Sequence, residues 1–268
     1  MSQSQHTGGE SSHGTDAAAD SVRTVSDAAS RNLATTTLPA GVLLLVPTEL
    51  ERRQLLASGQ LPVAAEAHLC GFGPIAAAAR TAQLIAASRP RLVLLVGIAG
   101  TYDPVALPVG QAAAFSEVAI DGVGAGEGPA RLSAAELGFP QWPGDGQTPK
   151  PAATERLPLS IGAAVRTASG PDARTAGLLL TVCAASADKQ QARERVRRFP
   201  GCVAEDMEAF GAALASHLAG VPLTVVRGIA NRAGDRDTSR WQIEAALVAA
   251  ARRAAERLAA FDPSEAPP

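Results

Sequence analysis

The feature that most constrains the fold is a series of short apolar runs, each separated from the next by a stretch that suits a helix. Residues 42–46 and 92–96 consist only of Val and Leu, and the runs at 177–182 and 223–226 are nearly as apolar. A strand without a polar face is buried on both sides, as in a parallel sheet that is covered by helices. The alternation therefore predicts an α/β domain with a largely parallel sheet.

Helix boundaries can be predicted from capping residues. Thr48 is placed to cap a helix in "TELERRQLLAS", with Glu51 at the capping-box position. Pro74 is expected to open a second helix, whose apolar face would comprise Ile75, Ala78, Ala82 and Ile85. The remaining expected elements are strands over 63–70, 108–121 and 173–186, a short helix around 133–137, an exposed helix over 188–199, a strand and helix over 201–220, and a closing helix from Asp237 or Thr238 to just before Pro263.

Composition excludes several classes of function. The 268 residues carry a net charge of −2 and only 3% aromatic side chains, which gives no case for binding nucleic acid. No apolar run is long enough to span a membrane, and no secretory signal is visible, so a soluble cytoplasmic protein is expected. The three scattered cysteines are interpreted as buried structural thiols, and no metal-ligand spacing is present.

One folded domain is expected. Residues 1–40 are rich in small and polar residues and cannot bury enough surface to offset their ordering entropy. We therefore predict a disordered segment over 1–40, a single domain over 41–262 and a short tail over 263–268.

Candidate functional residues follow the ends of the predicted strands, where ligands bind in α/β folds. Glu208 lies among small apolar residues, where a carboxylate could accept two hydroxyl groups or simply complement a helix dipole. Asn231 ends an apolar strand and could bind a purine base or form a turn. Glu49 or Glu51 could activate water, or both could be solvated helix charges.

Other motifs carry less information. The loops "GFGP" and "GIAG" permit close backbone approach to a ligand, but neither matches a dinucleotide or ATP pattern, so no cofactor is expected. His68 and His217 lack a nucleophilic partner in a recognisable motif and are interpreted as structural.

Several segments between residues 42 and 260 resemble the nucleoside phosphorylase/nucleosidase family. They are "VPTELE", "GFGPIAAAART", "VGIAG", "AEDMEAFGAALA" and "RGIANRAGDRDTSRW". The resemblance implies a three-layer αβα sandwich with a mixed, partly barrel-like central sheet. It also implies a purine nucleoside as the ligand, no cofactor or metal, and a homo-oligomer.

The resemblance also assigns roles to particular residues. Glu51 corresponds to the carboxylate that activates water, and Met207 and Glu208 to the ribose-binding pair. Further substrate contacts are expected at Gly73, Ala99, Gly100 and Ser186. Related phosphorylases place an Arg before the "VGxxG" loop to hold phosphate, whereas this chain has Leu95, which favours water as the nucleophile.

The last two segments, "AEDMEAFGAALA" and "RGIANRAGDRDTSRW", most resemble the futalosine-hydrolysing members of the family, which release hypoxanthine in menaquinone biosynthesis. The amide NH2 of Asn231 would donate to N7 or O6 of the departing base. Two alternatives remain: a methylthioadenosine/S-adenosylhomocysteine nucleosidase, and a nucleoside-binding protein that has lost catalysis. The 5′-substituent of the nucleoside and the role of Arg236 cannot be predicted.

Overall fold

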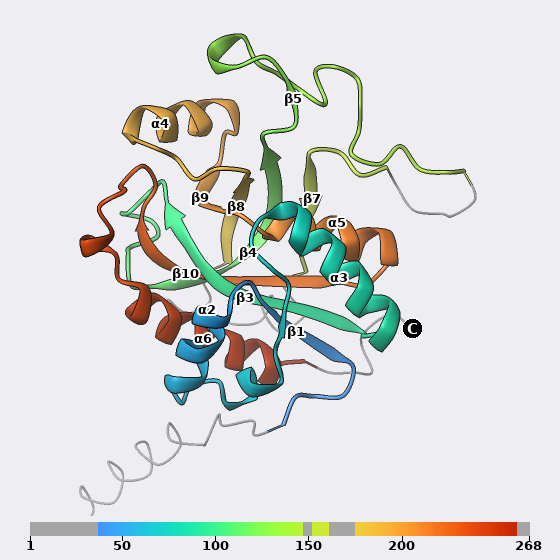
Figure 1. Ribbon diagram of the computed structural model, residues 1–268, viewed down its shortest axis with the longest axis vertical. Helices are drawn as coiled ribbons and strands as arrows, with labels where there is room; N and C mark the ends of the chain where they lie inside the picture. Colours follow the sequence, from blue (N-terminus) through green and yellow to red (C-terminus); the bar gives the residue numbers. More distant parts are fainter. Residues whose placement is uncertain (1–36, 147–151, 161–174, 262–268) are drawn as a thin grey trace, which may run out of the picture. The chain divides into compact units, whose positions relative to one another are not determined.

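A computed structural model describes residues 37–146, 152–160 and 175–261 (Figure 1). The predicted disordered segment 1–40, except its last four residues, and the tail 263–268 lie outside these ranges. Most of the loop over 122–160 is described. No helix among the described residues is long and apolar enough to cross a membrane.

The central sheet closes partly into a barrel. Its strands follow the order β10-β4-β8-β9-β3-β1-β2, and β10 also pairs with β3, which joins five of the strands into a ring. The pairs β3–β9, β4–β10 and β4–β7 are antiparallel and the others in this sheet are parallel, so the sheet is mixed, as predicted. The strands are β1 (Val42–Val46), β2 (His68–Leu69), β3 (Leu92–Thr101), β4 (Ala112–Asp121), β7 (Arg156–Pro158), β8 (Thr175–Val182), β9 (Cys202–Asp206) and β10 (Leu223–Arg232).

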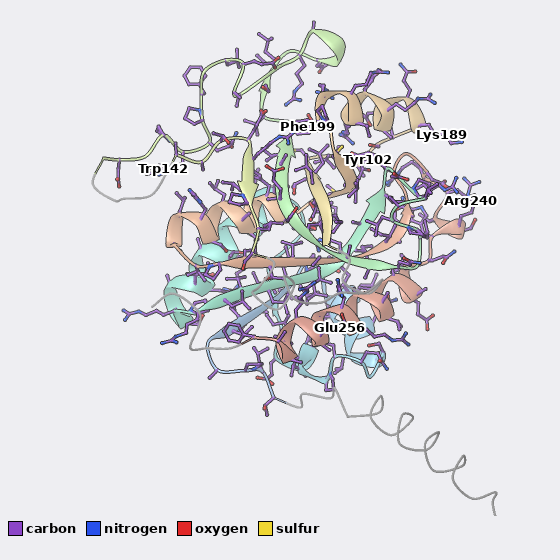
Figure 2. All side chains as sticks on the ribbon, turned by 180° about the vertical axis from the view of Figure 1, so that it is seen from behind. Tyr102, Trp142, Lys189, Phe199, Arg240 and Glu256 are labelled. Atoms are coloured by element: carbon purple, nitrogen blue, oxygen red, sulfur yellow. The ribbon has the colours of Figure 1, made fainter. Side chains whose placement is uncertain are left out.

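Helices cover both faces of this sheet (Figure 1). On one face α6 packs against the Val and Leu side chains of β1 and β3, and on the other α3 and α5 pack against β1, β3 and β10. A third, smaller apolar cluster includes side chains of β8 and Phe199 at the end of α4, and Tyr102 packs against this cluster (Figure 2). The helices are α2 (Glu49–Ala57), α3 (Pro74–Ser88), α4 (Lys189–Arg198), α5 (Ala209–Ala219) and α6 (Ile243–Ala259). The short elements are the 3-10 helices η1 (Pro62–Glu66), η2 (Gly128–Ala130) and η4 (Thr238–Arg240) and the strands β5 (Gly124–Ala125) and β6 (Leu132–Ser133).

The two predicted helix starts near the amino terminus are confirmed. Thr48 caps α2 through its hydroxyl, which accepts the Glu51 N–H, and Pro74 stands at the first turn of α3. The predicted apolar face of α3 is partly wrong. Ile85 is buried as predicted, but Ile75 is 84% exposed and Ala82 is also exposed, and the rest of the buried face is formed by Ala77, Thr81 and Leu84. This face packs against α5. Because α3 is rich in alanine, its sequence does not determine which of its faces is buried, and the packing against α5 decides this instead.

Four further predictions need correction. Residues 62–69 form a 3-10 helix and a two-residue strand instead of a strand over 63–70, because only the last residues pair with β1. Residues 134–138 form a turn instead of a helix. Asp237 caps the short helix η4, so that the closing helix begins only at Ile243. Cys183 is exposed, whereas burial raises the pKa of Cys70 to about 12 and that of Cys202 to about 11, as expected of structural thiols.

Candidate active site

Glu51 turns back from the first turn of α2 toward β3. Its side chain is buried, and its Oε1 accepts the Ile98 N–H at 3.1 Å. Its Oε2 accepts the Thr48 hydroxyl at 2.6 Å. Glu49, by contrast, is partly exposed and forms an ion pair with Arg52 at 2.8 Å on the helix surface. The solvated-charge interpretation therefore holds for Glu49 and fails for Glu51.

Glu208 immediately precedes α5 and is also buried. Its Oε1 accepts the N–H of Gly73 at 3.1 Å, which joins it to the "GFGP" loop. Gly73 has φ +86° and ψ 162°, a conformation that only glycine adopts readily. The loop glycine thus brings a backbone donor to the carboxylate while Pro74 starts the next helix.

Arg227 is a candidate site residue that the sequence analysis missed. It lies in β10 and is fully buried, with Nε and Nη2 donating to Asp206 Oδ2 at 3.0 and 2.6 Å. Nη2 also lies 3.3 Å from Oε2 of Glu208. The sequence signal was a lone charge inside an apolar strand, since such a charge needs a buried partner.

Gly97 leaves room where these groups converge. A methyl group at this position would clash with Arg227 Nη1 and would lie 2.8 Å from Glu51 Oε1. Within the described residues, Nη1 is buried and has no hydrogen-bond partner. A buried donor of this kind needs an acceptor, which makes Nη1 of Arg227 a candidate contact for a polar ligand.

Asp206 fixes the guanidinium in place. Its Oδ1 accepts the Thr181 hydroxyl at 2.6 Å, and its Oδ2 accepts the Ala209 N–H at 3.0 Å at the start of α5. Burial on its own would lower the pKa of Arg227, but the carboxylates of Asp206, Glu208 and Glu51 raise it above its usual value. The cation at the centre of the site is therefore permanent.

Unlike Arg227, Glu208 is not permanently charged. Burial raises the pKa of Glu208 to about 7, and the negative charge of Asp206 contributes to this increase. The positive charge of Arg227 and the hydrogen bond from the Gly73 N–H act in the opposite direction. The group can therefore change its protonation state near neutral pH, as carboxyls at functional sites often do.

Asn231 lies at the end of β10, beside Gly100 of β3, and a bulge before it shifts the register. Its Nδ2 donates to the carbonyl oxygens of Arg232 at 3.0 Å and Asp235 at 3.3 Å. Oδ1 lies 3.1 Å from the position of a methyl group added at Gly100. The sequence analysis expected the NH2 group to face the base. The backbone carbonyls engage it instead, so the acceptor Oδ1 is the atom that faces Gly100.

Arg236 stacks on Trp241, with the guanidinium carbon 5.2 Å from the ring centroid. Trp241 in turn donates its ring N–H to the carbonyl of Asp235. Trp241 also borders an open surface hollow of about 560 Å³ along α6, which does not include the buried carboxylates. Arg236 therefore contributes to the loop that holds Asn231.

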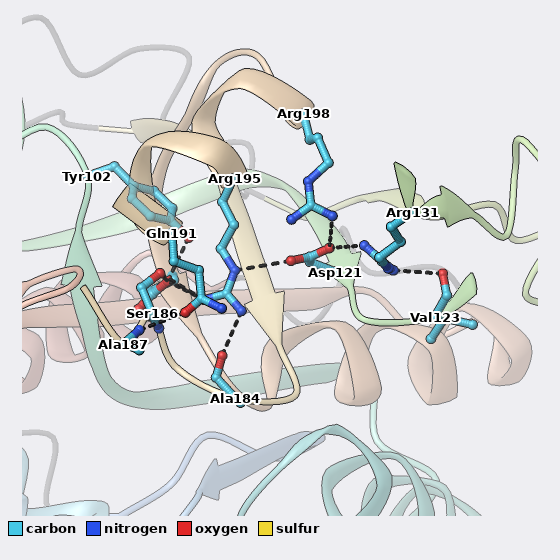
Figure 3. A network of polar contacts seen from close by, with 11 residues as sticks. Tyr102, Asp121, Val123, Arg131, Ala184, Ser186, Ala187, Gln191, Arg195 and Arg198 are labelled. Atoms are coloured by element: carbon cyan, nitrogen blue, oxygen red, sulfur yellow. Dashed lines mark hydrogen bonds and ion pairs between the residues drawn. The ribbon is translucent and has the colours of Figure 1, made fainter. Parts of the chain in front are cut away.

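The other expected substrate contacts lie in two regions, one in β3 and next to Glu208, the other around Tyr102, Glu205 and Arg195 (Figure 3). Ala99 and Gly100 are buried in β3, and Gly73 touches Glu208. Met207 packs against the apolar cluster next to Tyr102. Ser186 is fully buried, and its hydrogen bonds go to Glu205 and Arg195, so it joins a separate polar network. No group of His, Cys, Asp and Glu side chains within the described residues could hold a metal ion.

Comparison with known proteins shows the family of the chain. Residues 51–261 match the family model of the phosphorylase superfamily. A futalosine hydrolase of Streptomyces coelicolor is 35% identical over 184 residues, which cover 67% of this chain and 72% of that protein. A 5′-methylthioadenosine/S-adenosylhomocysteine nucleosidase of Chromohalobacter salexigens is 33% identical over 175 residues, 64% of this chain and 68% of that protein.

Solved structures share the fold. A 5′-methylthioadenosine/S-adenosylhomocysteine nucleosidase from S. pneumoniae, bound to a transition-state inhibitor, has a TM-score of 0.63 at 17% identity, over 82% of this chain and 99% of that one. The corresponding enzyme of Neisseria meningitidis has a TM-score of 0.60 at 18% identity, over 84% and 100%. The chain belongs to the phosphorylase superfamily. It is an enzyme of the N-glycosyl hydrolase class in which these relatives are named.

Proposed function

We propose that this protein hydrolyses the N-glycosidic bond of futalosine and releases hypoxanthine, a step of menaquinone biosynthesis in the cytoplasm. The observation that carries the proposal is that Glu51 and Arg227 meet at Gly97 and that Arg227 also pairs with Glu208, with Asn231 at the end of the same strand as Arg227. The name of the Streptomyces coelicolor relative supplies the substrate.

Water is the proposed nucleophile. The oxygen of a water molecule can accept from Arg227 Nη1 while the water donates to Glu51 Oε1, which satisfies the buried guanidinium nitrogen. Glu51 then removes a proton as the water attacks the anomeric carbon. The side chain of Leu95 is buried in the apolar core and offers no charge to a phosphate ion.

Glu208 is proposed to bind the ribose. As an ionised carboxylate it can accept hydrogen bonds from two hydroxyl groups, and its position next to Arg227 puts the sugar beside the attacking water. A negative charge here also favours the positively charged, oxocarbenium-like sugar of a dissociative transition state.

Asn231 is proposed to stabilise the departing base. Its Oδ1 can accept a hydrogen bond from N7–H of the purine once solvent has protonated that nitrogen. Asn cannot itself act as the acid, so its contribution is electrostatic.

We also propose that the protein works as a homo-oligomer. Phe72 and Ile75, at the start of α3 beside the Gly73 loop, are 67% and 84% exposed. Large exposed apolar side chains next to a site are typical of interaction surfaces.

A base-release assay tests the proposed reaction. Purified protein in phosphate-free buffer is expected to release hypoxanthine from futalosine, and Glu208→Ala and Asn231→Ala are each expected to slow this release by at least about 100-fold. Preferred release of adenine from methylthioadenosine would favour the alternative nucleosidase. Dependence on added phosphate would refute hydrolysis, and full activity of both variants would refute the assigned site. Thermal stabilisation by these nucleosides without any base release would indicate a binding protein.

The pH dependence of the reaction tests the role of Glu208. Because burial raises its pKa to about 7, the ribose-binding ionised form is lost as the pH falls below this value. We expect kcat/KM to rise with pH on a limb centred near 7. In Glu208→Gln the residual activity is expected to lack this limb. An identical limb in the variant would assign the titration to another group.

A further inference from the structure

Thr48 makes a contact that a helix cap alone does not need. As the N-cap of α2 it accepts the N–H of Glu51 at 3.3 Å, and it also donates its hydroxyl proton to Oε2 of Glu51 at 2.6 Å. A hydroxyl group has a single proton, so this proton is committed to the carboxylate. Capping uses only the acceptor oxygen of the side chain. The second contact therefore has no part in starting the helix.

The carboxylate of Glu51 is diverted from the usual capping contact. In a capping box, the side chain of the third helical residue accepts the backbone N–H of the N-cap residue. Glu51 occupies this third position, but its carboxylate accepts the Thr48 hydroxyl and the Ile98 N–H of β3. The pair that the sequence predicts as a capping box thus reaches the central sheet, where Oε1 meets Arg227 at Gly97.

The two donors fix the orientation of this carboxylate. The last torsion of a Glu side chain has a broad energy minimum, so an unrestrained carboxylate rotates readily. The Ile98 N–H holds Oε1 at 3.1 Å, and the Thr48 hydroxyl holds Oε2 with the short bond typical of a charged acceptor. Because Oε2 is occupied by Thr48, Oε1 is the oxygen that can take a proton from water.

Thr48 is itself held in place on both sides. Its backbone carbonyl accepts the Arg52 N–H at 3.0 Å within α2, and the carbonyl of the preceding Pro47 accepts the Gly71 N–H at 3.2 Å. A β-branched side chain has few allowed rotamers, which restricts the position of the hydroxyl further. The donor is therefore preorganised, as an effective catalytic site requires.

We propose that Thr48 is a positioning residue of the reaction, whose hydroxyl fixes Oε2 of Glu51 and thereby presents Oε1 to the attacking water. The inference rests on the proposed function, because it takes Glu51 as the general base. It goes beyond the role expected from the sequence, in which Thr48 only caps a helix.

The test is steady-state hydrolysis of futalosine by Thr48 variants of the full-length protein. Thr48→Val has nearly the same shape but cannot donate, and is expected to lower kcat by about 10- to 100-fold, the effect of a lost hydrogen bond to a charged group. KM is expected to change by less than about threefold, because Glu208, Arg227 and Asn231 remain. Thr48→Ser keeps the hydroxyl and is expected to retain kcat within about fivefold.

A double variant separates positioning from structural damage. In the Glu51→Gln background, Thr48→Val is expected to lower the residual kcat by less than about threefold, because the hydroxyl acts only through that carboxylate. Asp188→Ala is the matched control, since exposed Asp188 caps α4 by accepting the Gln191 N–H at 2.8 Å. It is expected to lower Tm about as much as Thr48→Val does and to leave kcat within about twofold.

An unchanged kcat in Thr48→Val would overturn the proposal while leaving the proposed function intact. The same holds if Thr48→Ser is as slow as Thr48→Val, or if Thr48→Val causes equal losses in the wild-type and Glu51→Gln backgrounds. If Thr48→Val does not fold, Thr48→Ala, which also lacks the hydroxyl, replaces it with the same expected loss of kcat. Absence of base release by the wild-type protein would refute the proposed function and this inference with it.

Discussion

Replacement of Arg227 by Met is expected to lower the free energy of unfolding by about 3–5 kcal/mol, because it leaves buried carboxylates without their cation. Asp206 and Glu208 both pair with this guanidinium, and the side chains of Arg227 and Asp206 are fully buried. Met has a similar length and can fill the space, so loss of charge outweighs loss of packing. The measurement is urea-induced unfolding followed by circular dichroism.

The pH dependence of the lost stability shows whether the cause is the missing charge or the changed packing. Arg227 lowers the pKa of Glu208 against the effect of burial, so its removal raises that pKa above about 7. A carboxyl whose pKa is raised in the folded state stabilises that state below its unfolded pKa and loses this contribution as the pH rises. The variant should therefore lose more stability at pH 8 than at pH 5.

Arg53→Met provides the matched control. Arg53 is 72% exposed and lies 3.5 Å from Glu49 on the surface of α2. An exposed pair of this kind contributes less than about 1 kcal/mol. A loss below about 1 kcal/mol in Arg227→Met as well, or a loss that does not vary with pH, would contradict the central role of the buried cation.

Much of the fold could be predicted from the sequence because its strands are apolar on both faces. A strand that is buried on both sides can be recognised by its apolar composition alone. Its register cannot be predicted in this way, because it has no alternation of polar and apolar residues. The cap at Thr48 and the proline at position 74 are local signals, and both held. The buried face of α3 and the first residue of α6 depend on tertiary contacts. These contacts cannot be predicted from the residues of each helix alone.

The site was only partly predictable, because some of its contacts join residues that only the folded sheet brings together. Glu51 and Glu208 follow strands and so met the expectation that ligands bind at strand ends. Arg227 is paired with residues 19 and 21 positions earlier, and it became recognisable only when β9 and β10 were placed in one barrel. Ser186 met the strand-end expectation, yet its hydroxyl is engaged by Glu205.

Replacement of Glu51 by Gln is expected to reduce kcat by about 100- to 10,000-fold, the range found when a general base is lost. The amide oxygen of Gln can still accept the Ile98 N–H, and its NH2 group can donate to the Thr48 hydroxyl oxygen, so the fold should be retained. Glu208, Arg227 and Asn231 are unchanged, so the affinity for futalosine should fall much less than kcat. Single-turnover base release combined with a binding titration separates the two effects.

Glu49→Gln decides between the two acidic residues of the turn. Glu49 lies two residues away in the same first turn, but its side chain is 40% exposed and pairs with Arg52. Its loss is expected to change kcat by less than about threefold, because surface ion pairs of this kind contribute little. The reverse outcome, an active Glu51→Gln and an inactive Glu49→Gln, would show that α2 turns its other carboxylate toward the substrate. The water would then lie away from Gly97, and the unpartnered nitrogen of Arg227 would require a different acceptor.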